Sequence, residues 1–287
     1  MTESLLLKRI SVLTVLLLGS LISLFLPYLA TPTQSEFLSV TFLDIGQGDA
    51  TLIETPDGVK LLIDGGPDGT VLRRLATELP WFDHTLDIIL GTHPDKDHIG
   101  GLVDVLKRFT VGQIITTENT GETMVASSFR KGLVQEGAIV TMARAGQVYQ
   151  LGASTTLTIF SPASNPAMLE SNTASIVAKL SYGDIDFMLT GDAPISIEEY
   201  LVKTYGPALQ SEVLKLGHHG SKTSSSESFL DTVKPAYAVV SAGKGNSYGH
   251  PHQAVVEAVN ARGINLVSTI DSGSIHFETD GIAVWVR

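Results

Sequence analysis

Four side chains able to bind a metal ion fall within six positions of one another. They are His93, Asp95, Asp97 and His98, in the segment Thr92-His93-Pro94-Asp95-Lys96-Asp97-His98-Ile99-Gly100-Gly101. Imidazoles and carboxylates together suit a divalent cation of intermediate hardness. Such an ion lowers the pKa of its bound water to about 7 and supplies hydroxide at neutral pH. The segment therefore predicts a metal-dependent hydrolase, in which Asp97 binds the metal and takes the proton of the reacting water.

The segment lies between two apolar stretches. Residues 86–91 before it predict a buried strand, and residues 102–106 after it predict a helix. The four ligands therefore lie on a strand-to-helix loop, which holds side chains rigidly and leaves them open to substrate.

Polar residues also end several other predicted strands. Asp44 and Asp49 follow strand 38–43, Asp64 follows 59–63, Asp192 follows 185–190, and His218 and His219 follow 213–216. Each has another interpretation: a turn at Asp64, a helix N-cap at Asp192, and a surface pair at His218 and His219. Their recurrence together favours one site at a common edge.

The remaining pattern predicts an α/β (α+β) fold. Hairpins open the first half, short strands close the second, and helices at 71–79, 127–136, 195–205, 227–233 and 252–262 fall between them. We expect two mixed sheets packed together with helices outside.

The chain of 287 residues contains no cysteine, which excludes disulfides, thiolate metal sites and thiol nucleophiles. The net charge of −11 means that nucleic-acid binding depends on a local basic patch.

The N-terminal residues predict a membrane segment. Lys8 and Arg9 precede residues 10–30, an apolar stretch of about the 20 residues that a membrane-spanning helix needs. We favour an uncleaved anchor, residues 1–30, over a signal peptide, because Tyr28 suits a cleavage site after Ala30 poorly. A linker, 31–36, and a hydrolase domain, 37–287, follow. The positive-inside rule predicts a single-pass protein of the cell membrane with an extracytoplasmic domain, secreted if the segment is cleaved.

Five motifs resemble a known family. His93-x-Asp95-x-Asp97-His98-x-Gly100-Gly101 resembles the metallo-β-lactamase superfamily motif. The other four resemble the extracellular domain of ComEC-type competence (DNA-uptake) proteins: Asp44-Ile-Gly-Gln-Gly-Asp-Ala50, Leu189-Thr-Gly-Asp192, Gly217-His-His-Gly-Ser-Lys-Thr-Ser-Ser-Ser226 and Tyr248-Gly-His-Pro-His252. The resemblance covers roughly residues 39–285. It implies an αββα sandwich with metals at one edge.

The resemblance also implies roles for individual residues. His93 and Asp95 would line one metal position, Asp97, His98 and His218 the other, and Asp192 would bridge them. Supporting residues or alternative ligands would be Asp44, Asp49, Asp64, Asn172 and His219. The superfamily usually has His at the position of Asp95, and no His occurs between His98 and His218. This predicts one or two divalent ions, Mn²⁺ or Zn²⁺, with an oxygen-rich first position that favours a single tightly held metal or manganese.

Two polar loops suggest the substrate. Residues 220–226 predict a phosphate cradle that uses Ser221, Lys222, Thr223 and Ser224, or else a polar loop with Ser226 as N-cap. In residues 243–252, Lys244 adds positive charge, and Tyr248 would either stack on a base or close the loop. His250 or His252 would protonate a leaving oxygen or bind phosphate, unless His252 only caps the next helix.

We therefore favour a metal-dependent phosphodiesterase, a nuclease acting on DNA outside the membrane. Its expected partners are DNA or another phosphodiester, and the membrane. The sequence leaves open whether a separate channel protein is a further partner. One alternative is a hydrolase of a small ester, lactone or β-lactam. Another is a non-catalytic extracellular DNA-binding module with a structural metal.

Overall fold

The computed structural model describes Thr14, Ser20 and residues 35–287, of which Glu36–Arg287 form a compact unit. Within the described part of the chain, no helix combines the length and apolarity of a membrane span. The predicted anchor, residues 1–30, lies outside the described residues except for Thr14 and Ser20, so it stays a prediction.

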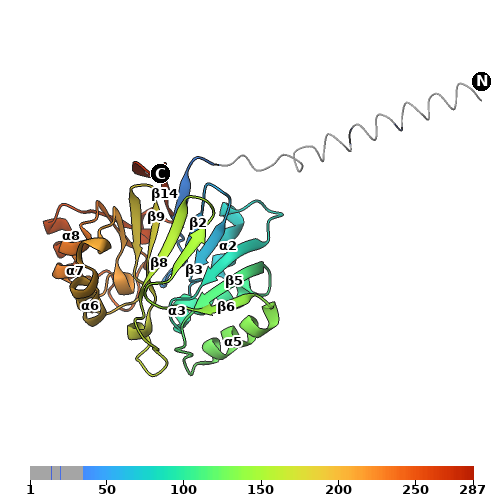
Figure 1. Cartoon of the computed structure of the whole chain (residues 1–287), viewed down its shortest axis with the longest axis horizontal. Helices are drawn as coiled ribbons and strands as arrows, with labels where there is room; N and C mark the ends of the chain where they lie inside the picture. Colours follow the sequence, from blue (N-terminus) through green and yellow to red (C-terminus); the bar gives the residue numbers. More distant parts are fainter. Residues whose placement is uncertain (1–13, 15–19, 21–34) are drawn as a thin grey trace, which may run out of the picture. The chain divides into compact units, whose positions relative to one another are not determined.

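Two mixed sheets form the centre of this unit (Figure 1). The first has the order β15-β14-β1-β2-β3-β4-β5-β6. Its strands are β1 (Leu38–Phe42), β2 (Thr51–Glu54), β3 (Lys60–Ile63), β4 (Thr85–Leu90), β5 (Thr110–Thr116), β6 (Ile139–Met142), β14 (Ile275–Thr279) and β15 (Val284–Val286). The second has the order β13-β12-β11-β10-β9-β8-β7. Its strands are β7 (Val148–Leu151), β8 (Thr155–Ser161), β9 (Val177–Tyr182), β10 (Ile185–Leu189), β11 (Val213–Lys215), β12 (Tyr237–Val240) and β13 (Asn265–Ser268).

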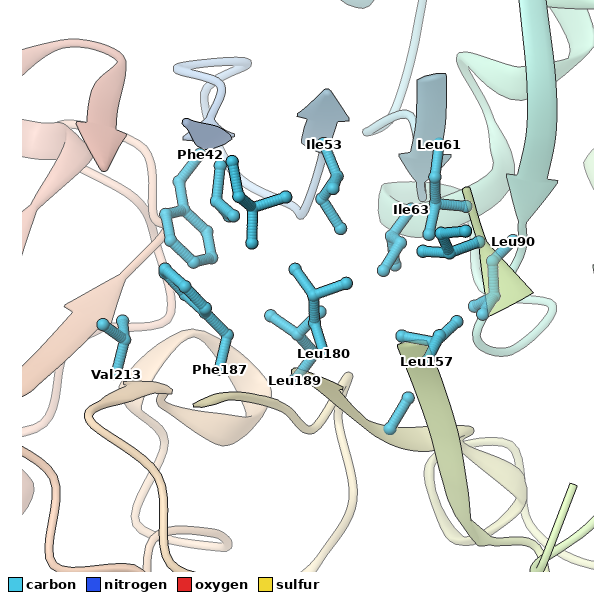
Figure 2. Packing of buried hydrophobic residues seen from close by; sticks show 14 of the residues in the cluster. Phe42, Ile53, Leu61, Ile63, Leu90, Leu157, Leu180, Phe187, Leu189 and Val213 are labelled. Carbon is cyan, nitrogen blue, oxygen red and sulfur yellow. The ribbon is translucent and has the colours of Figure 1, made fainter. Parts of the chain in front are cut away.

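The main core lies between the two sheets. Figure 2 shows Phe42 and Leu61 from the first sheet facing Phe187 and Leu157 from the second. Successive side chains of a strand point to opposite faces. Leu61 therefore enters this core, whereas Leu62 packs on the outer side of the first sheet.

Helices cover both outer faces. On the first sheet lie α2 (Thr70–Glu78), α4 (Leu102–Val105) and α5 (Met124–Glu136); on the second lie α6 (Ile195–Tyr205), α7 (Glu227–Val233) and α8 (Gln253–Ala261) (Figure 1). Short elements complete the unit: α3 (Lys96–Ile99), η1 (Asn172–Ala174), η2 (Gly206–Leu209), η3 (Gly217–Gly220) and α9 (Thr269–Ser272). The predicted pair of mixed sheets between helices is confirmed.

One edge of the sandwich collects the carboxyl ends of parallel strands. Strands β3 to β6 are parallel in the first sheet, and β10 to β13 are parallel in the second. Asp64 and Thr92 follow β3 and β4, whereas Asp192 and His218 follow β10 and β11. Each sheet thus contributes half of one polar cluster.

Candidate metal centre

Asp192 lies in the middle of four imidazoles. Its Oδ1 atom is 3.3 Å from Nε2 of His98, and its Oδ2 atom is 3.6, 3.7 and 4.0 Å from Nε2 of His218, His219 and His93. All four rings therefore turn the same nitrogen toward one carboxylate. We call these five residues, together with Asp95 and Asp97, the metal centre.

Three buried atoms of the metal centre have no hydrogen-bond partner in the described part of the chain. They are Nε2 of His93, Nε2 of His98 and Oδ1 of Asp192. The last two are close but not aligned for a hydrogen bond. An unsatisfied buried polar atom costs about 1–3 kcal/mol. Imidazole nitrogens and carboxylate oxygens are the ligands of a divalent cation, so this donor set fits one.

The two outer carboxylates divide the predicted ligands into two groups. Asp95 Oδ2 is 3.7 Å from His93 Nε2, so the structure brings together the two residues predicted for the first metal position. Asp97 Oδ2 is 3.3 Å from His219 Nε2. The imidazole in contact with Asp97 is thus that of His219, predicted as an alternative ligand, whereas His218 contacts Asp192.

Asp64 orients two imidazoles at once. It adopts a left-handed backbone (φ 57°), and its side chain accepts from Thr92 N at 2.8 Å, Thr92 Oγ1 at 2.7 Å and His98 Nδ1 at 2.8 Å. Since the Thr92 hydroxyl proton goes to Asp64, Thr92 Oγ1 must accept from His93 Nδ1, 2.9 Å away. In their neutral forms, both imidazoles therefore carry their proton on Nδ1 and leave the Nε2 lone pair for a metal.

Two consecutive histidines have an unusual backbone. His218 and His219 both lie in the left-handed region, with φ of 50° and 56°. Such residues are uncommon outside glycine and cost about 1–3 kcal/mol each. Here the strained turn after β11 brings both rings to Asp192. His218 Nδ1 lies 3.0 Å from Thr223 Oγ1, and His219 Nδ1 lies 3.1 Å from Asp49 Oδ1.

Two other predicted supports, Asp44 and Asn172, lie in segments with different contacts. Asp44 accepts from Arg74 at 2.6 Å and so ties its loop to α2 rather than to a ligand. Asn172 has a buried Oδ1 atom without a partner among the described residues. Its neighbour Ser171 donates to Asp95 Oδ1 at 2.6 Å, which brings this turn to the first metal position.

Charge in the metal centre is balanced by protonated imidazoles. Burial raises the pKa of Asp192, but the charges of His98 and His219 lower it well below the ordinary value. Burial lowers the pKa of His219, yet Asp192 and Asp49 raise it to about 9. For His93, burial and the charge of His98 both lower the pKa. Protons on His98 and His219 thus supply the positive charge that the carboxylates attract.

His250 and His252 form a rim beside the metal centre. The His250 ring lies 5.5 Å from that of His218 and 5.0 Å from that of His252. The backbone N–H of Lys222 donates to His252 Nδ1 at 3.1 Å, so neutral His252 carries its proton on Nε2. The side chain of His252 makes no cap hydrogen bond to α8.

Gln47 fixes the second rim histidine in the same way. Its Oε1 atom accepts from Gly243 N at 3.2 Å, which directs its amide N–H toward His250 Nδ1, 3.4 Å away. Neutral His250 therefore also carries its proton on Nε2. Burial and the charge of His219 lower the pKa of His250 to about 4, so this ring is a neutral hydrogen-bond donor at pH 7.

The backbone amides of residues 221–226 already have partners. Their acceptors are His218 O, His252 Nδ1, Ser221 Oγ, Ser221 O and, for the last two amides, the carboxylate of Glu198. Ser226 accepts from Phe229 N as the N-cap of α7. Ser221 and Ser224 are buried, whereas Lys222 and Thr223 are exposed. Substrate contact from this loop is therefore open to the side chains of Lys222 and Thr223.

The second polar loop is more open. Lys244 and Tyr248 are exposed, and the Tyr248 ring stacks on His250 at 5.6 Å between ring centres.

Sequence reasoning missed Thr92, Gln47 and Lys215. The first two bear no metal-ligand signature, but a lysine within the apolar residues 213–216 was a detectable signal.

The chain is similar to known proteins both in sequence and in fold. The model of the metallo-beta-lactamase superfamily matches residues 43–244. The chain is 29% identical to ComE operon protein 3 of Bacillus subtilis (strain 168) over 268 residues, covering 86% of this chain and 34% of that protein. It is 34% identical to Competence protein ComA of Neisseria gonorrhoeae over 257 residues, covering 88% of this chain and 34% of that protein. The chain thus spans about a third of the length of these relatives.

A solved structure agrees with the fold. The metallo-beta-lactamase fold protein YhfI from Bacillus subtilis superposes with a TM-score of 0.61 at 14% identity, covering 85% of this chain and 100% of that one. At this identity the likeness concerns the fold alone.

Proposed function

The chain belongs to the metallo-beta-lactamase superfamily, and from its metal centre and rim we propose that it is a divalent-metal-dependent phosphodiesterase that cleaves DNA outside a cell membrane. Its similarity to a protein named a competence protein supports DNA as the substrate. The observation that carries the choice of a phosphodiester is the pair of Nε2–H donors on His250 and His252 beside the metal centre.

The metal would be held by the metal centre. Its first position would use His93, Asp95 and Asp192, and its second would use Asp97, His98, His219 and Asp192. A bound divalent ion supplies hydroxide at neutral pH and neutralises charge on the attacked group. The carboxylates at Asp95 and Asp192 favour a harder ion, and we propose Mn²⁺ ahead of Zn²⁺.

The rim residues would bind the phosphodiester. The Nε2–H groups of His250 and His252 would donate to its anionic oxygens. Lys222 would add an exposed positive charge, which strengthens contact with a phosphate. Asp97, whose side chain is partly exposed, would take the proton from the attacking water.

The location and partners are part of the same proposal. Residues 1–30 would anchor the chain in the membrane, with the hydrolase domain on the extracytoplasmic side. We also propose a separate channel protein as a partner that would supply passage for the DNA.

The test is DNA cleavage by the purified chain after chelation and reloading with Mn²⁺, Zn²⁺ or Mg²⁺. We expect cleavage that requires metal and falls at least 100-fold in Asp97→Asn, while DNA binding falls little. His276→Ala is the matched control, because His276 lies next to Glu78 on β14, a strand that carries no residue of the metal centre. Absence of cleavage with every metal at full occupancy would contradict the proposal; metal-independent DNA binding without turnover would instead favour the DNA-binding module.

A specific observation favours a second candidate, a hydrolase of a small ester, lactone or β-lactam. A cavity of about 350 Å³ lies beside His93 and is lined mainly by apolar side chains, among them Phe129, Leu133 and Val140. An apolar cavity of this size suits a small ligand. A panel of chromogenic esters, lactones and β-lactams distinguishes the candidates, since a nuclease would leave the panel uncleaved.

A further inference from the structure

Lys215 is a buried charge that the proposed reaction does not use. It lies at the end of β11, only 3% exposed, and cannot reach solvent or a DNA backbone. Its ammonium group lies 2.9 Å from Asp49 Oδ1 and donates to Leu216 O at 3.0 Å. A lysine is almost never fully buried unless it is paired, so its place between the sheets calls for an explanation.

The same carboxylate oxygen serves a metal-centre histidine. Asp49 Oδ1 lies 2.9 Å from Lys215 Nζ and 3.1 Å from His219 Nδ1. His219 therefore donates its Nδ1 proton to Asp49, and its Nε2 atom lies 3.3 Å from Asp97 and 3.7 Å from Asp192. The chain of contacts runs from Lys215 through Asp49 to His219 and ends at the metal centre.

Asp49 also lies close enough to serve as a ligand itself. One oxygen of Asp49 and ligand atoms of His98, Asp192 and His219 all lie within 4.8 Å of one another. The ammonium of Lys215 lies 2.9 Å from Oδ1 of this carboxylate and competes for the lone pairs of that oxygen. A carboxylate held in this way orients an imidazole, as carboxylate–histidine–metal triads do.

We propose that Lys215 is a positioning residue: it holds Asp49 as the hydrogen-bond partner of His219 and keeps that carboxylate out of the metal coordination. His219 is then the ligand and Asp49 its support. The proposal rests on the metal site of the proposed function, but not on DNA as its substrate. Metal affinity, measured without any nucleic acid, therefore tests the two separately.

The experiment is a titration of the metal-free chain with Mn²⁺ and Zn²⁺, comparing the natural protein with Lys215→Met, Asp49→Asn and the double variant. We expect Lys215→Met to weaken metal binding about 10–100-fold, the range for loss of a supporting residue. We expect the double variant to bind no more weakly than Asp49→Asn, because Lys215 acts through Asp49. Lys215→Ala, which likewise removes the donor to Asp49, is the second variant if Lys215→Met does not fold.

Lys179→Met is the matched control. Lys179 also contacts one carboxylate, Asp186 at 2.8 Å, and one carbonyl, Ala208 O at 3.0 Å, but on β9 and away from the metal centre. It should lower thermal stability and leave metal affinity unchanged. Unchanged affinity in folded Lys215→Met or Lys215→Ala would overturn the proposal. Tighter binding in either would also overturn it, since it would make Asp49 a ligand released by loss of the lysine.

Discussion

Thr92 gives its hydroxyl proton to Asp64, across 2.7 Å, and is therefore left to accept one from His93. A residue that is not a metal ligand thus decides which nitrogen of a ligand carries the proton. The adjacent backbone N–H of Thr92 also donates to Asp64. This arrangement makes the side-chain oxygen, rather than the bulk of Thr92, the important feature.

Thr92→Val should therefore weaken metal binding about 10–100-fold, because valine keeps the shape of threonine but leaves His93 Nδ1 without its acceptor. The measurement is metal affinity by competition with a chromogenic chelator. Thr92→Ser retains the hydroxyl and should bind metal nearly as well as the natural protein. Equal loss in both variants would show that packing, not the hydroxyl, matters.

The metal-free protein should lose stability as the pH rises from about 6.5 to 9. The pKa of His219 is raised to about 9 in the folded chain, so its contribution is fully present below the unfolded pKa of 6.5 and lost above 9. A shift of this size corresponds to roughly 3 kcal/mol. Thermal denaturation with a chelator at several pH values measures it.

Bound metal should abolish this loss of stability, because metal binding requires the neutral imidazole of His219 and the metal replaces its proton. The metal-loaded protein should thus keep its melting temperature over the same pH range, and metal affinity should rise with pH. A metal-free melting temperature that is constant or rising between pH 6.5 and 9 would contradict the prediction.

Gly48→Ala should destabilise the fold by at least about 2 kcal/mol, since it adds a side chain at a strained position and a steric clash. Gly48 has φ of 135°, and an added Cβ would lie 2.3 Å from the carbonyl oxygen of Asp97. Gly58→Ala is the control, with φ of 80° and open space around the added atom. Denaturant unfolding compares the two, and only the first should also weaken metal binding, through displacement of Asp97.

Lys222→Ala should weaken DNA binding with little change in sequence preference. The slope of log affinity against log salt concentration should fall by about one, the contribution of one released counterion. The measurement is fluorescence anisotropy at several salt concentrations in the presence of Mn²⁺ and with cleavage blocked by Asp97→Asn. Lys203→Ala, on the exposed surface of α6, should have a smaller effect on both quantities. An equal effect of the two lysines would indicate a diffuse charge rather than a contact at the rim.

Most helices and strands of the fold were predictable from sequence, but two exposed edge strands were not. Residues 195–205 and 227–233 were predicted as helices and are the bounds of α6 and α7. The strands β6 and β7 were missed. Both lie at sheet edges, and most of their side chains are exposed or partly exposed, so they lack the apolar run that marks a buried strand.

The residue types of the metal centre were predictable from sequence, but the contacts between them and the positions of their protons were not. That Asp192 and the segment around His98 would meet followed from strand ends converging on one edge. Which of His218 and His219 contacts Asp97 depends on two left-handed backbone conformations, which no spacing reveals. The proton positions on His93 and His252 depend on Thr92 and Lys222, whose contacts exist only in the folded chain.

The contact between Asp49 and His219 joins residues 170 positions apart in the chain. One belongs to the loop between the first two strands of the first sheet, and the other follows a strand of the second sheet. Contacts of such separation form slowly, because the entropy of closing the intervening loop must be overcome before the contact stabilises the chain. A growing or partly folded chain would thus have no complete metal site, and hydrolytic activity would begin only when the whole sandwich has assembled.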